Sequence, residues 1–497
     1  MNKIILHILI LAGICALLYL GNFTNSYSYY DDYQEIVLNK YLNPQLNSPL
    51  KLFTDFNFFH FYVPFKHLTN YCLNFVFGYN PHVSHLLSDF IHIFNVILCY
   101  LLILRLSKSY AAAFFTALLF GVSPVCSNAV NEIAARGHLF TVFFGFLSFY
   151  IYTFTHASGL KRNQSRHFTA IAVLLYAAGL LFWPTVIVLP ALLAVYEFAV
   201  YREKKNSAGA VVSVGAQIKK VFFKILPFAV TACAFIALNL YISHLRNSMF
   251  TQSAVFDNGL IFSVKLFGWQ SFYKIPAIIA HYLAYSFVPP FFDIIFAPPL
   301  ALFSQTPFVY LGSFALILLF AFISFKVYKK NQTEGLLGTS FFVLFLLPGI
   351  AVMYKSELIS LRYMYAACIG IFFIACSFAK YYIIPYLTGY KKYAGLTVFI
   401  AFFVFSFSNS FSRKYMWKDP QTVTDAMIVN GGLSQVWGWA LKINWIPEMK
   451  NKLAYLQEAG RVLEENKYGY DLQYDLIKQN LEGRIEFIKQ LESSAQK

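Results

Sequence analysis

Continuous apolar runs, most of them close to the length needed to cross a lipid bilayer, recur along this chain. They cover roughly residues 4–20, 85–104, 110–125, 139–156, 168–183, 185–201, 221–242, 308–325, 336–354, 363–379 and 394–410. A helix needs about 20 apolar residues to cross the hydrocarbon core, or fewer where flanking side chains snorkel. Inside hydrocarbon each backbone amide must bond within its own segment, which selects helices. The sequence therefore predicts an all-α, polytopic membrane helix bundle with about eleven spans.

The composition excludes several other classes of protein. The chain is 58% hydrophobic and only 12% charged, about half the charged fraction of a soluble protein. The continuous runs also differ from the short alternating segments of a membrane β-barrel. A net charge of +16 could indicate nucleic-acid binding. Because the cations form short clusters between apolar runs, we instead expect the lipid bilayer as a partner and no nucleic acid.

The cation clusters predict the orientation of the spans. They comprise Arg105 and Lys108; Lys161, Arg162 and Arg166; Arg202, Lys204, Lys205, Lys219, Lys220 and Lys224; Lys326, Lys329 and Lys330; and Lys380, Lys391 and Lys392. These clusters occupy alternate loops, which are then cytoplasmic, so the N-terminus is expected inside and the C-terminus outside. We expect a multi-pass protein of a bacterial cytoplasmic membrane. An apolar stretch at 259–290 would have to cross an even number of times, which an outer-surface or re-entrant helix would satisfy.

The chain is expected to divide into two parts. Residues 1–410 would form the membrane domain, in which 22–84 make a large first extracytoplasmic loop with short amphipathic helices. Residues 411–497 are polar and would form a soluble extracytoplasmic tail. In this tail, apolar periodicity predicts one helix from Pro447 to before Gly469 and a second from about Leu472 to Leu491, which together make a helical hairpin. We expect this hairpin to serve packing or docking rather than catalysis.

An acidic pair, Asp31 and Asp32, directly follows the first span within a tyrosine-rich stretch. Such a pair is ordinary if it is solvated, and costly if it is buried near a membrane. The surrounding tyrosines favour a site partly shielded from water, where a carboxylate can act as general base toward a hydroxyl group.

Cationic and imidazole side chains are expected on the same side of the membrane. They include Lys66, His85, His92, Arg136, His138 and Arg362. Fixed cations can hold a phosphate group, although each one alone also fits an interfacial anchor. No metal or nucleotide motif occurs, so the sequence identifies no cofactor. A requirement for a divalent metal stays open. Cys72 and Cys126 could face outward, which leaves a disulfide between them open.

Four stretches, in order along the chain, resemble those of a known family. They are Asp31-Asp32 followed by Asn39; Tyr62-Val63-Pro64-Phe65, Leu73-Asn74-Phe75 and Gly78-Tyr79-Asn80-Pro81, leading to His85-Leu86 and His92; Ser123-Pro124-Val125 through Arg136-Gly137-His138-Leu139; and Leu361-Arg362-Tyr363-Met364-Tyr365. On these motifs the sequence resembles the type C membrane glycosyltransferases. It is most similar to the transmembrane and tetratricopeptide-repeat O-mannosyltransferases and their bacterial relatives, over most of 1–410.

The sequence also departs from the motifs of that family. Val63 replaces the arginine of the Tyr-Arg-Pro motif, with Lys66 nearby as a substitute. Asn128 stands where the family has an acidic residue, and Glu132, four residues later, could take its place. His138 replaces an aspartate. Leu361 stands where the family has a glutamate, and Glu357 lies one helical turn earlier. A Lys-Glu pair of the family falls at Trp183-Pro184, and the repeat array shrinks to one or two degenerate helical hairpins.

The resemblance implies a function and a set of site residues. The chain would transfer a sugar, with inversion, from a polyprenyl-phosphate-linked donor to an acceptor hydroxyl, as in protein O-mannosylation of Ser or Thr. Asp31 would be the catalytic base, and Asp32 would orient it or the acceptor. Arg136, Arg362, His85 and Lys66 would bind the donor phosphate, with supporting roles for His92, Glu132, His138, Glu357 and Tyr363. The expected partners are the lipid-linked sugar and an acceptor protein or glycan.

Two alternatives remain open. One is a polymerase or ligase of lipid-linked polysaccharide, which would act on glycan acceptors. The other is a non-enzymatic transporter or scaffold. A transporter favours carboxylates in the middle of spans, whereas most of those outside the tail here fall in loops expected on the outer side. Neither the sugar nor the acceptor can be identified from the sequence.

Overall fold

The computed structural model describes residues 2–28, 31–54, 61–156, 161–208, 214–249, 274–288, 307–356, 360–430, 432–443, 449–465 and 474–495. Over these ranges the chain forms helices joined by turns, and no strand. Ten helices are long and apolar enough to cross a membrane, or eleven when one bent pair is counted as a span. The expected fold class, an all-α polytopic bundle with about eleven spans, is therefore confirmed, and the chain is a multi-pass membrane protein.

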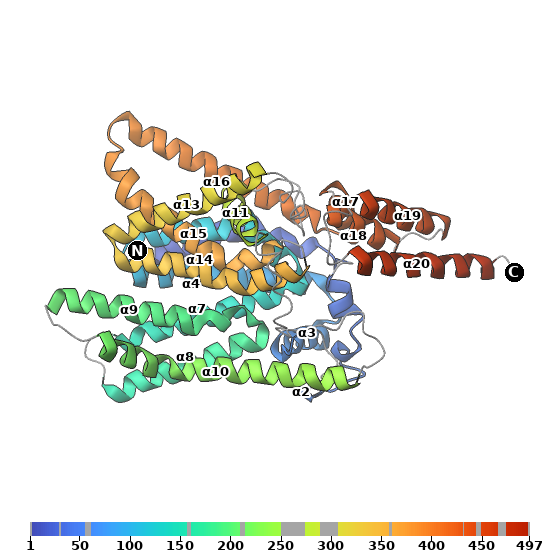
Figure 1. The fold of residues 1–497 in the computed structure, drawn as a ribbon, viewed down its shortest axis with the longest axis horizontal. Helices are drawn as coiled ribbons and strands as arrows, with labels where there is room; N and C mark the ends of the chain where they lie inside the picture. Colours follow the sequence, from blue (N-terminus) through green and yellow to red (C-terminus); the bar gives the residue numbers. More distant parts are fainter. Residues whose placement is uncertain are drawn as a thin grey trace.

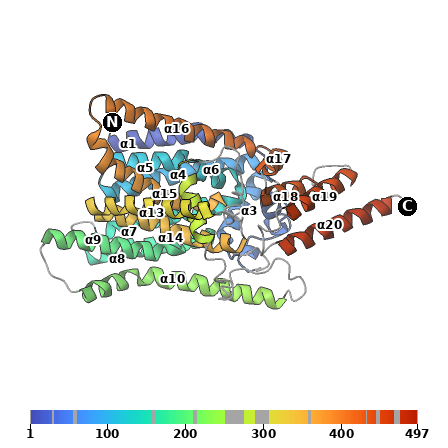
Figure 2. The same cartoon turned by 45° about the horizontal axis from the view of Figure 1, so that its top comes forward.

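The long helices make up one bundle. They are α1 (Lys3–Tyr19), α4 (Pro81–Ser107), α5 (Tyr110–Val122), α6 (Pro124–Asn131), α7 (Arg136–Thr153), α8 (Arg162–Phe182), α9 (Leu189–Ala208), α10 (Val214–Met249), α13 (Pro307–Lys330), α14 (Gln332–Ser356), α15 (Met364–Phe378) and α16 (Tyr390–Met416). They run side by side, and the N-terminus lies at one end of the bundle (Figure 1). The opposite end carries the first loop and the C-terminal helices (Figures 1 and 2). We call this the loop end, and the other the N-terminal end.

Aromatic and aliphatic side chains fill the interior of the bundle. Tyr100, Phe120 and Phe149 are each fully buried, and each packs in the same core cluster. The helices at the edge have the opposite character, because they expose large apolar side chains such as Leu318 on α13 and Val398 on α16. Lipid can cover such surfaces, so these helices need no polar outer face.

A proline breaks one expected span. The apolar run at 110–125 is divided into α5 and α6, which are bent by 55° relative to each other. Pro124 opens α6 at its first position, where its missing N–H costs nothing, and its ring disfavours a continuous helix. After α6 the chain passes through the short helix η4 (Ile133–Ala135) and enters α7. The break therefore puts Glu132 and Arg136 at helix ends rather than inside a span.

The first loop contains short helices. They are η1 (Leu20–Thr24), η2 (Tyr33–Val37), η3 (Lys40–Leu42), α2 (Lys51–Thr54) and α3 (Pro64–Phe77). Gly78 ends α3 with φ +68°, a conformation that favours glycine. The Asn80 side chain then accepts the backbone N–H groups of His82 and Val83 and caps α4. Other short helices are η5 (Phe154–His156), η6 (Pro184–Val188), α11 (Lys274–Tyr285), η9 (Leu361–Tyr363), η10 (Ala379–Ile383) and η11 (Ile384–Tyr386).

One expectation needs correction, and another is only partly covered by the described residues. A disulfide between Cys72 and Cys126 is wrong, because Cys72 is exposed while Cys126 is buried, with its Sγ 3.4 Å from Cys368 Sγ. Within the stretch 259–290 the structure describes α11 and the three residues after it. In α11, Tyr282 is fully buried and its hydroxyl donates to the carbonyl of Ser360, just before η9, at 2.7 Å. The expected outer-surface or re-entrant helix in this stretch stays a prediction.

Four helices follow the last span. They are α17 (Pro420–Asn430), α18 (Gly432–Lys442), α19 (Met449–Glu465) and α20 (Tyr474–Ala495). The periodicity of the sequence predicted α19 and α20 at nearly these positions but missed α17 and α18, which are short. Buried Val436, Leu456 and Leu481 join α18, α19 and α20 in one apolar cluster. The four helices project beyond the loop end of the bundle (Figures 1 and 2).

Candidate active site

Three segments that are distant in sequence meet at the loop end of the bundle. The first is the stretch around Asp31 and Asp32, which follows α1 and η1. The second is the turn from α6 through η4 into α7, and the third is η9 at the start of α15. Direct bonds join the first segment to both of the others. The structure thus brings together residues from the first, third and fourth motifs of the sequence.

Arg362 binds two carboxylates at once. Its Nη1 atom lies 2.9 Å from Asp31 Oδ2 and 2.7 Å from Glu132 Oε1. The Glu132 side chain is fully buried, whereas the Asp31 side chain keeps 27% of its exposure. One guanidinium therefore faces two carboxylates and can neutralise only one negative charge. Of these two carboxylates, only that of Asp31 is accessible to solvent.

Asp32 is an internal anchor of the loop. It is 1% exposed, and its Oδ1 accepts the backbone N–H of Ala134 at 2.6 Å. Its Oδ2 accepts both the backbone N–H and the hydroxyl of Ser28, at 3.0 and 2.9 Å. Burial raises the pKa of the Asp32 carboxyl to about 6, although these donors oppose the shift. Asp32 therefore ties the loop to η4.

A second ion pair, between Lys66 of α3 and Glu35 of η2, lies beside this cluster. The Lys66 ammonium is also 5.0 Å from the centre of the Trp183 ring, close enough for a cation–π contact. Burial raises the pKa of the Glu35 carboxyl, while the positive charge of Lys66 opposes that shift. Asp31 and Arg362 also act electrostatically on Glu35, so the two ion pairs belong to one cluster.

Arg136 differs from the other cations of the cluster. It is 2% exposed, and none of its three guanidinium nitrogens has a hydrogen-bond partner within the described part of the chain. Asp32 and Tyr27 are close enough to act on its charge. His85 lies nearby, with Nε2 3.2 Å from the Ser26 carbonyl and Nδ1 unpartnered among the described residues. A buried cation without a paired anion is costly, which marks this place as one that could hold an anion.

His138 and Tyr363 form an aromatic wall of the cluster. The His138 ring lies 5.0 Å from the Trp183 ring and 5.5 Å from the Tyr363 ring, centre to centre. Arg362 also lies over Tyr363, at 6.0 Å from its centre. These rings shield the ion pairs on one side.

Two of the expected supporting residues are not in this cluster as described. His92 bonds inside the bundle, with Nδ1 2.8 Å from the Tyr365 hydroxyl and Nε2 3.1 Å from the Gly121 carbonyl. Both ring nitrogens are thus engaged in helix packing. Glu357 lies outside the described residues.

The junction between α16 and α17 supports the loop that carries the carboxylates. The Asn25 side chain donates to the Lys414 carbonyl at 3.1 Å, and the Ser26 N–H donates to the Lys418 carbonyl at 2.8 Å. The Lys414 side chain also packs against Gly21, where an added Cβ would lie 2.7 Å from its ammonium nitrogen. The beginning of the tail is therefore joined to the segment just before Asp31.

Sequence reasoning missed several contributors to this cluster. Glu35 stands three residues after Asp32 and could have been found as a third carboxylate of the same loop. Trp183 was noted only as a departure from a family motif, and its contact with Lys66 depends on tertiary packing. Nothing local in the sequence marks Asn25. Among the described residues, no group of three or more His, Cys, Asp or Glu side chains is arranged to hold a metal ion.

The chain was compared with known proteins. No family model and no curated protein matches it. Among solved structures, the apo oligosaccharyltransferase of Archaeoglobus fulgidus matches with 13% identity and a TM-score of 0.43, covering 92% of this chain and 59% of that chain. The same enzyme tethered to an acceptor peptide with an NVT sequon matches with 14% identity and a TM-score of 0.47, covering 92% and 58%.

A third solved structure is ArnT from Cupriavidus metallidurans bound to undecaprenyl phosphate. It matches with 13% identity and a TM-score of 0.40, covering 96% of this chain and 77% of that chain. Both proteins are type C glycosyltransferases. This chain spans a little over half the length of the archaeal enzyme. Because the sequence identities and TM-scores are this low, the function proposed below is argued from the residues of this chain.

Proposed function

We propose that this protein is a membrane glycosyltransferase that moves a sugar from a polyprenyl-phosphate carrier to an acceptor hydroxyl. The observation that carries the proposal is the buried guanidinium of Arg136, which has no hydrogen-bond partner among the described residues and lies beside an accessible carboxylate cluster. A transferase of this kind needs both features: an anion site for the leaving phosphate and a base for the acceptor. The motif resemblance supplies the sugar donor, because the geometry alone specifies only an anion and a base.

Arg136 is the principal phosphate ligand in this proposal. As the sugar leaves, the phosphate oxygen that carried it gains negative charge, which a fixed cation in a dry site stabilises strongly. Arg136 already bears the cost of burial, and its nitrogens are unengaged among the described residues. His85 would donate from its second ring nitrogen. Arg362 and Lys66 remain in the proposal as cations of the same cluster, although each already holds a carboxylate.

Asp31 is the general base in this proposal. It is the most exposed of the four carboxylates in the cluster, since Asp32 and Glu132 are buried and Glu35 keeps 19% of its exposure. Asp31 would remove the proton of the acceptor hydroxyl. The acceptor oxygen would then bond to the anomeric carbon, and the carbon–oxygen bond to the phosphate would break with its electron pair on the phosphate. This single displacement inverts the anomeric configuration.

Other residues hold the reacting groups in place. Arg362 orients Asp31 and is itself held by Glu132. Asp32 fixes the loop to η4 through the Ala134 N–H, while its two bonds to Ser28 hold the loop itself. His138 and Tyr363 would exclude water from the ion pairs. We propose that the site faces the extracytoplasmic side of a bacterial inner membrane, with the N-terminus in the cytoplasm and the C-terminus outside.

The acceptor is proposed to be a protein Ser or Thr hydroxyl, with the tail as a degenerate tetratricopeptide-like docking element. This part rests on the motif resemblance. It is tested by mass analysis of glycoproteins and of lipid-linked glycans from a strain that lacks the gene. Loss of O-linked sugar from proteins supports the proposal. Loss of glycan polymer with unchanged glycoproteins would instead assign the chain to polysaccharide synthesis.

The central test measures transfer of labelled sugar from a polyprenyl-phosphate donor in membranes that contain the protein. Asp31→Asn should lower the rate by about 10²–10⁴-fold, the usual contribution of a general base. The matched control is Asp425→Asn, because Asp425 is also ion-paired, to Lys442 at 2.7 Å, but lies on α17. The control should keep the wild-type rate. Full transfer by Asp31→Asn would show that Asp31 is not the base.

A further inference from the structure

A second charged cluster lies at the N-terminal end of the bundle. Arg362 precedes α15 and Lys380 follows it, so the 15 residues of this helix, or about 22 Å of its rise, separate the two clusters. The second cluster consists of the end of α13, the start of α14 and the turn η10. None of its residues takes part in the proposed transfer.

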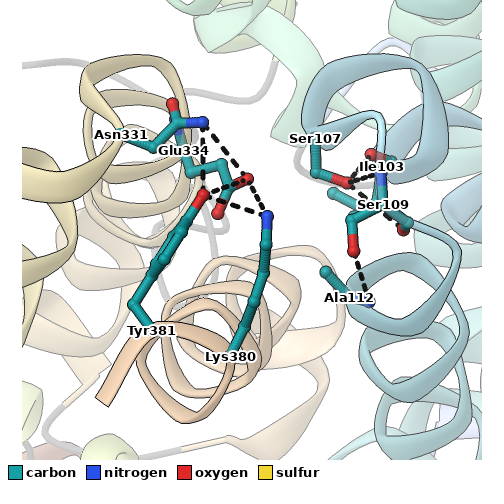
Figure 3. Close-up of polar contacts among 8 residues, drawn as sticks. All are labelled: Ile103, Ser107, Ser109, Ala112, Asn331, Glu334, Lys380 and Tyr381. Atoms are coloured by element: carbon teal, nitrogen blue, oxygen red, sulfur yellow. Dashed lines mark hydrogen bonds and ion pairs between the residues drawn. The ribbon is translucent and has the colours of Figure 1, made fainter. Parts of the chain in front are cut away.

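Glu334 organises this cluster. Its carboxylate is fully buried, and its Oε1 accepts from Lys380 at 2.9 Å and from the Tyr381 hydroxyl at 3.1 Å. The Asn331 side chain accepts the Glu334 backbone N–H at 3.1 Å and so caps α14. Figure 3 shows Asn331, Lys380 and Tyr381 directed toward this carboxylate. These contacts fix η10 with Lys380 and Tyr381 turned inward.

Tyr382, the next residue in η10, meets two other lysines. Its ring centre is 5.9 Å from the ammonium nitrogen of Lys326 and 5.8 Å from that of Lys330. Its hydroxyl donates to the Lys326 carbonyl at 3.0 Å. Lys329, on the same turn of α13, lies 5.2 Å from the ring of Phe325. The three lysines are thus arranged around aromatic rings.

The three lysines have no anionic partner in the described part of the chain. The nearby carboxylate of Glu334 pairs with Lys380, and no other ion pair of the described residues includes Lys326, Lys329 or Lys330. Toward the middle of α13 the surface becomes apolar, since Phe322 and Phe325 are more than half exposed. Acyl chains can cover these rings, while the lysines reach the headgroup level.

We propose that Lys326, Lys329 and Lys330, with Tyr382 as a wall between two of them, form a binding site for the headgroup of an anionic phospholipid. The charge of the site is opposite to that of the headgroup phosphate, and the apolar surface beside it suits the acyl chains. A soluble anion would use the lysines but leave Phe322 and Phe325 uncovered. The site therefore selects a lipid in the leaflet opposite to the proposed active site.

The test is native mass spectrometry of the purified full chain in detergent, titrated with phosphatidylglycerol or with phosphatidylcholine. Each lysine near an anionic headgroup is worth about a fivefold change in affinity. We expect wild type to retain phosphatidylglycerol at least tenfold more tightly, and K326Q/K329Q/K330Q to lose this preference. Tyr382→Ala should weaken it, and Tyr382→Phe should keep it.

The matched control is K391Q/K392Q. Lys391 and Lys392 open α16 at the same end of the bundle, but neither makes a cation–π contact with a described ring. This control should bind phosphatidylglycerol as wild type does. Equal loss in both lysine variants would overturn the site in favour of diffuse surface charge. Displacement of the lipid by millimolar inorganic phosphate would overturn the lipid assignment. Melting in phosphatidylcholine shows whether each variant is folded, independently of sugar transfer.

Discussion

The two ends of the bundle both bury carboxylates, but they satisfy them differently. At the N-terminal end, Glu334 has Lys380, Tyr381 and Asn331 around it. At the loop end, Glu132 must share Arg362 with Asp31, while Arg136 has no hydrogen-bond partner among the described residues. One oxygen of each buried glutamate, Glu334 Oε2 and Glu132 Oε2, has no hydrogen-bond partner among the described residues, so the two ends differ in how charge is paired. A carboxylate with a cation of its own is typical of groups that hold a structure together. Mismatched charge in a buried cluster is typical of a site that completes its interactions with a ligand.

The largest expected difference between the two ends is in stability. Arg362→Gln leaves Glu132 buried without a cation, which should cost about 3–5 kcal/mol. Lys380→Gln also leaves a buried carboxylate without its cation, but the Tyr381 hydroxyl and the Asn331 amide still donate to Glu334, so we expect a smaller loss of about 2 kcal/mol. Unfolding in detergent, followed by circular dichroism, measures both. Equal losses of stability would mean that the stability of the loop end does not depend especially on the shared Arg362.

The pH dependence of Asp32 should have the next largest effect. Its pKa is raised to about 6 by burial, so the folded state binds this proton more tightly than the unfolded state does. The resulting stabilisation is fully present below the unfolded pKa of about 4, and it is lost as the pH rises through about 6. The full difference corresponds to roughly 3 kcal/mol.

Asp32→Asn cannot titrate and is the variant that isolates this term. We expect the melting temperature of wild type to fall relative to that of Asp32→Asn between pH 4 and pH 7. Glu334→Gln, which alters a carboxylate of the other end, should keep the fall that is due to Asp32. A constant difference between wild type and Asp32→Asn over this range would contradict a raised pKa for Asp32.

Arg136→Gln should have a smaller effect on stability, and of opposite sign. Removing a buried charge for which the described residues offer no hydrogen-bond partner should leave the free energy of unfolding unchanged or raise it by about 2 kcal/mol. The same variant should raise the KM for the lipid-linked donor, whereas Arg136→Lys should retain part of the affinity. Thermal melting without donor and donor titration give the two readouts. A strongly destabilised Arg136→Gln would indicate a structural role for this arginine.

The smallest effect is expected at two asparagines that play similar local roles. Asn25→Ala removes the bond to the Lys414 carbonyl, and Asn331→Ala removes the cap of α14. Each should cost about 1 kcal/mol. Only Asn25→Ala should also lower kcat for sugar transfer, by several-fold and with little change in KM, because it loosens the loop before Asp31. Equal kcat values in the two variants would show that the α16–α17 junction does not influence catalysis at the site.

Much of the membrane fold could be predicted because it follows from local patterns. The apolar runs located the spans, and the periodicity of the tail located α19 and α20. The break between α5 and α6 was missed, although Pro124 marks it, because the apolar run continues across the proline. Helix α17 was missed because its apolar residues show little helical periodicity. Helix α18 is amphipathic but only 11 residues long, and helices this short depend on packing.

For the site, the sequence indicated most of the residue types but not their pairing. Asp31, Arg136 and Arg362 were all expected to act together. Their positions did not indicate which arginine would hold a carboxylate and which would find no hydrogen-bond partner in the described part of the chain. His92 was expected to support the site, yet it bonds to Tyr365 and Gly121 inside the bundle. Pairing depends on distances between segments that lie hundreds of residues apart.

The sequence by itself determined that this chain lies in a membrane as helices. Its apolar runs are continuous rather than alternating, which excludes a β-barrel, so their backbone amides must bond within each run. It also placed an acidic pair directly after the first span. Only the tertiary structure decided that Arg362 would neutralise Asp31 and that Arg136 would have no hydrogen-bond partner within the described ranges. The physical reason is that charge interactions depend on separation in space and on burial, and both are set by how α1, α6, α7 and α15 pack.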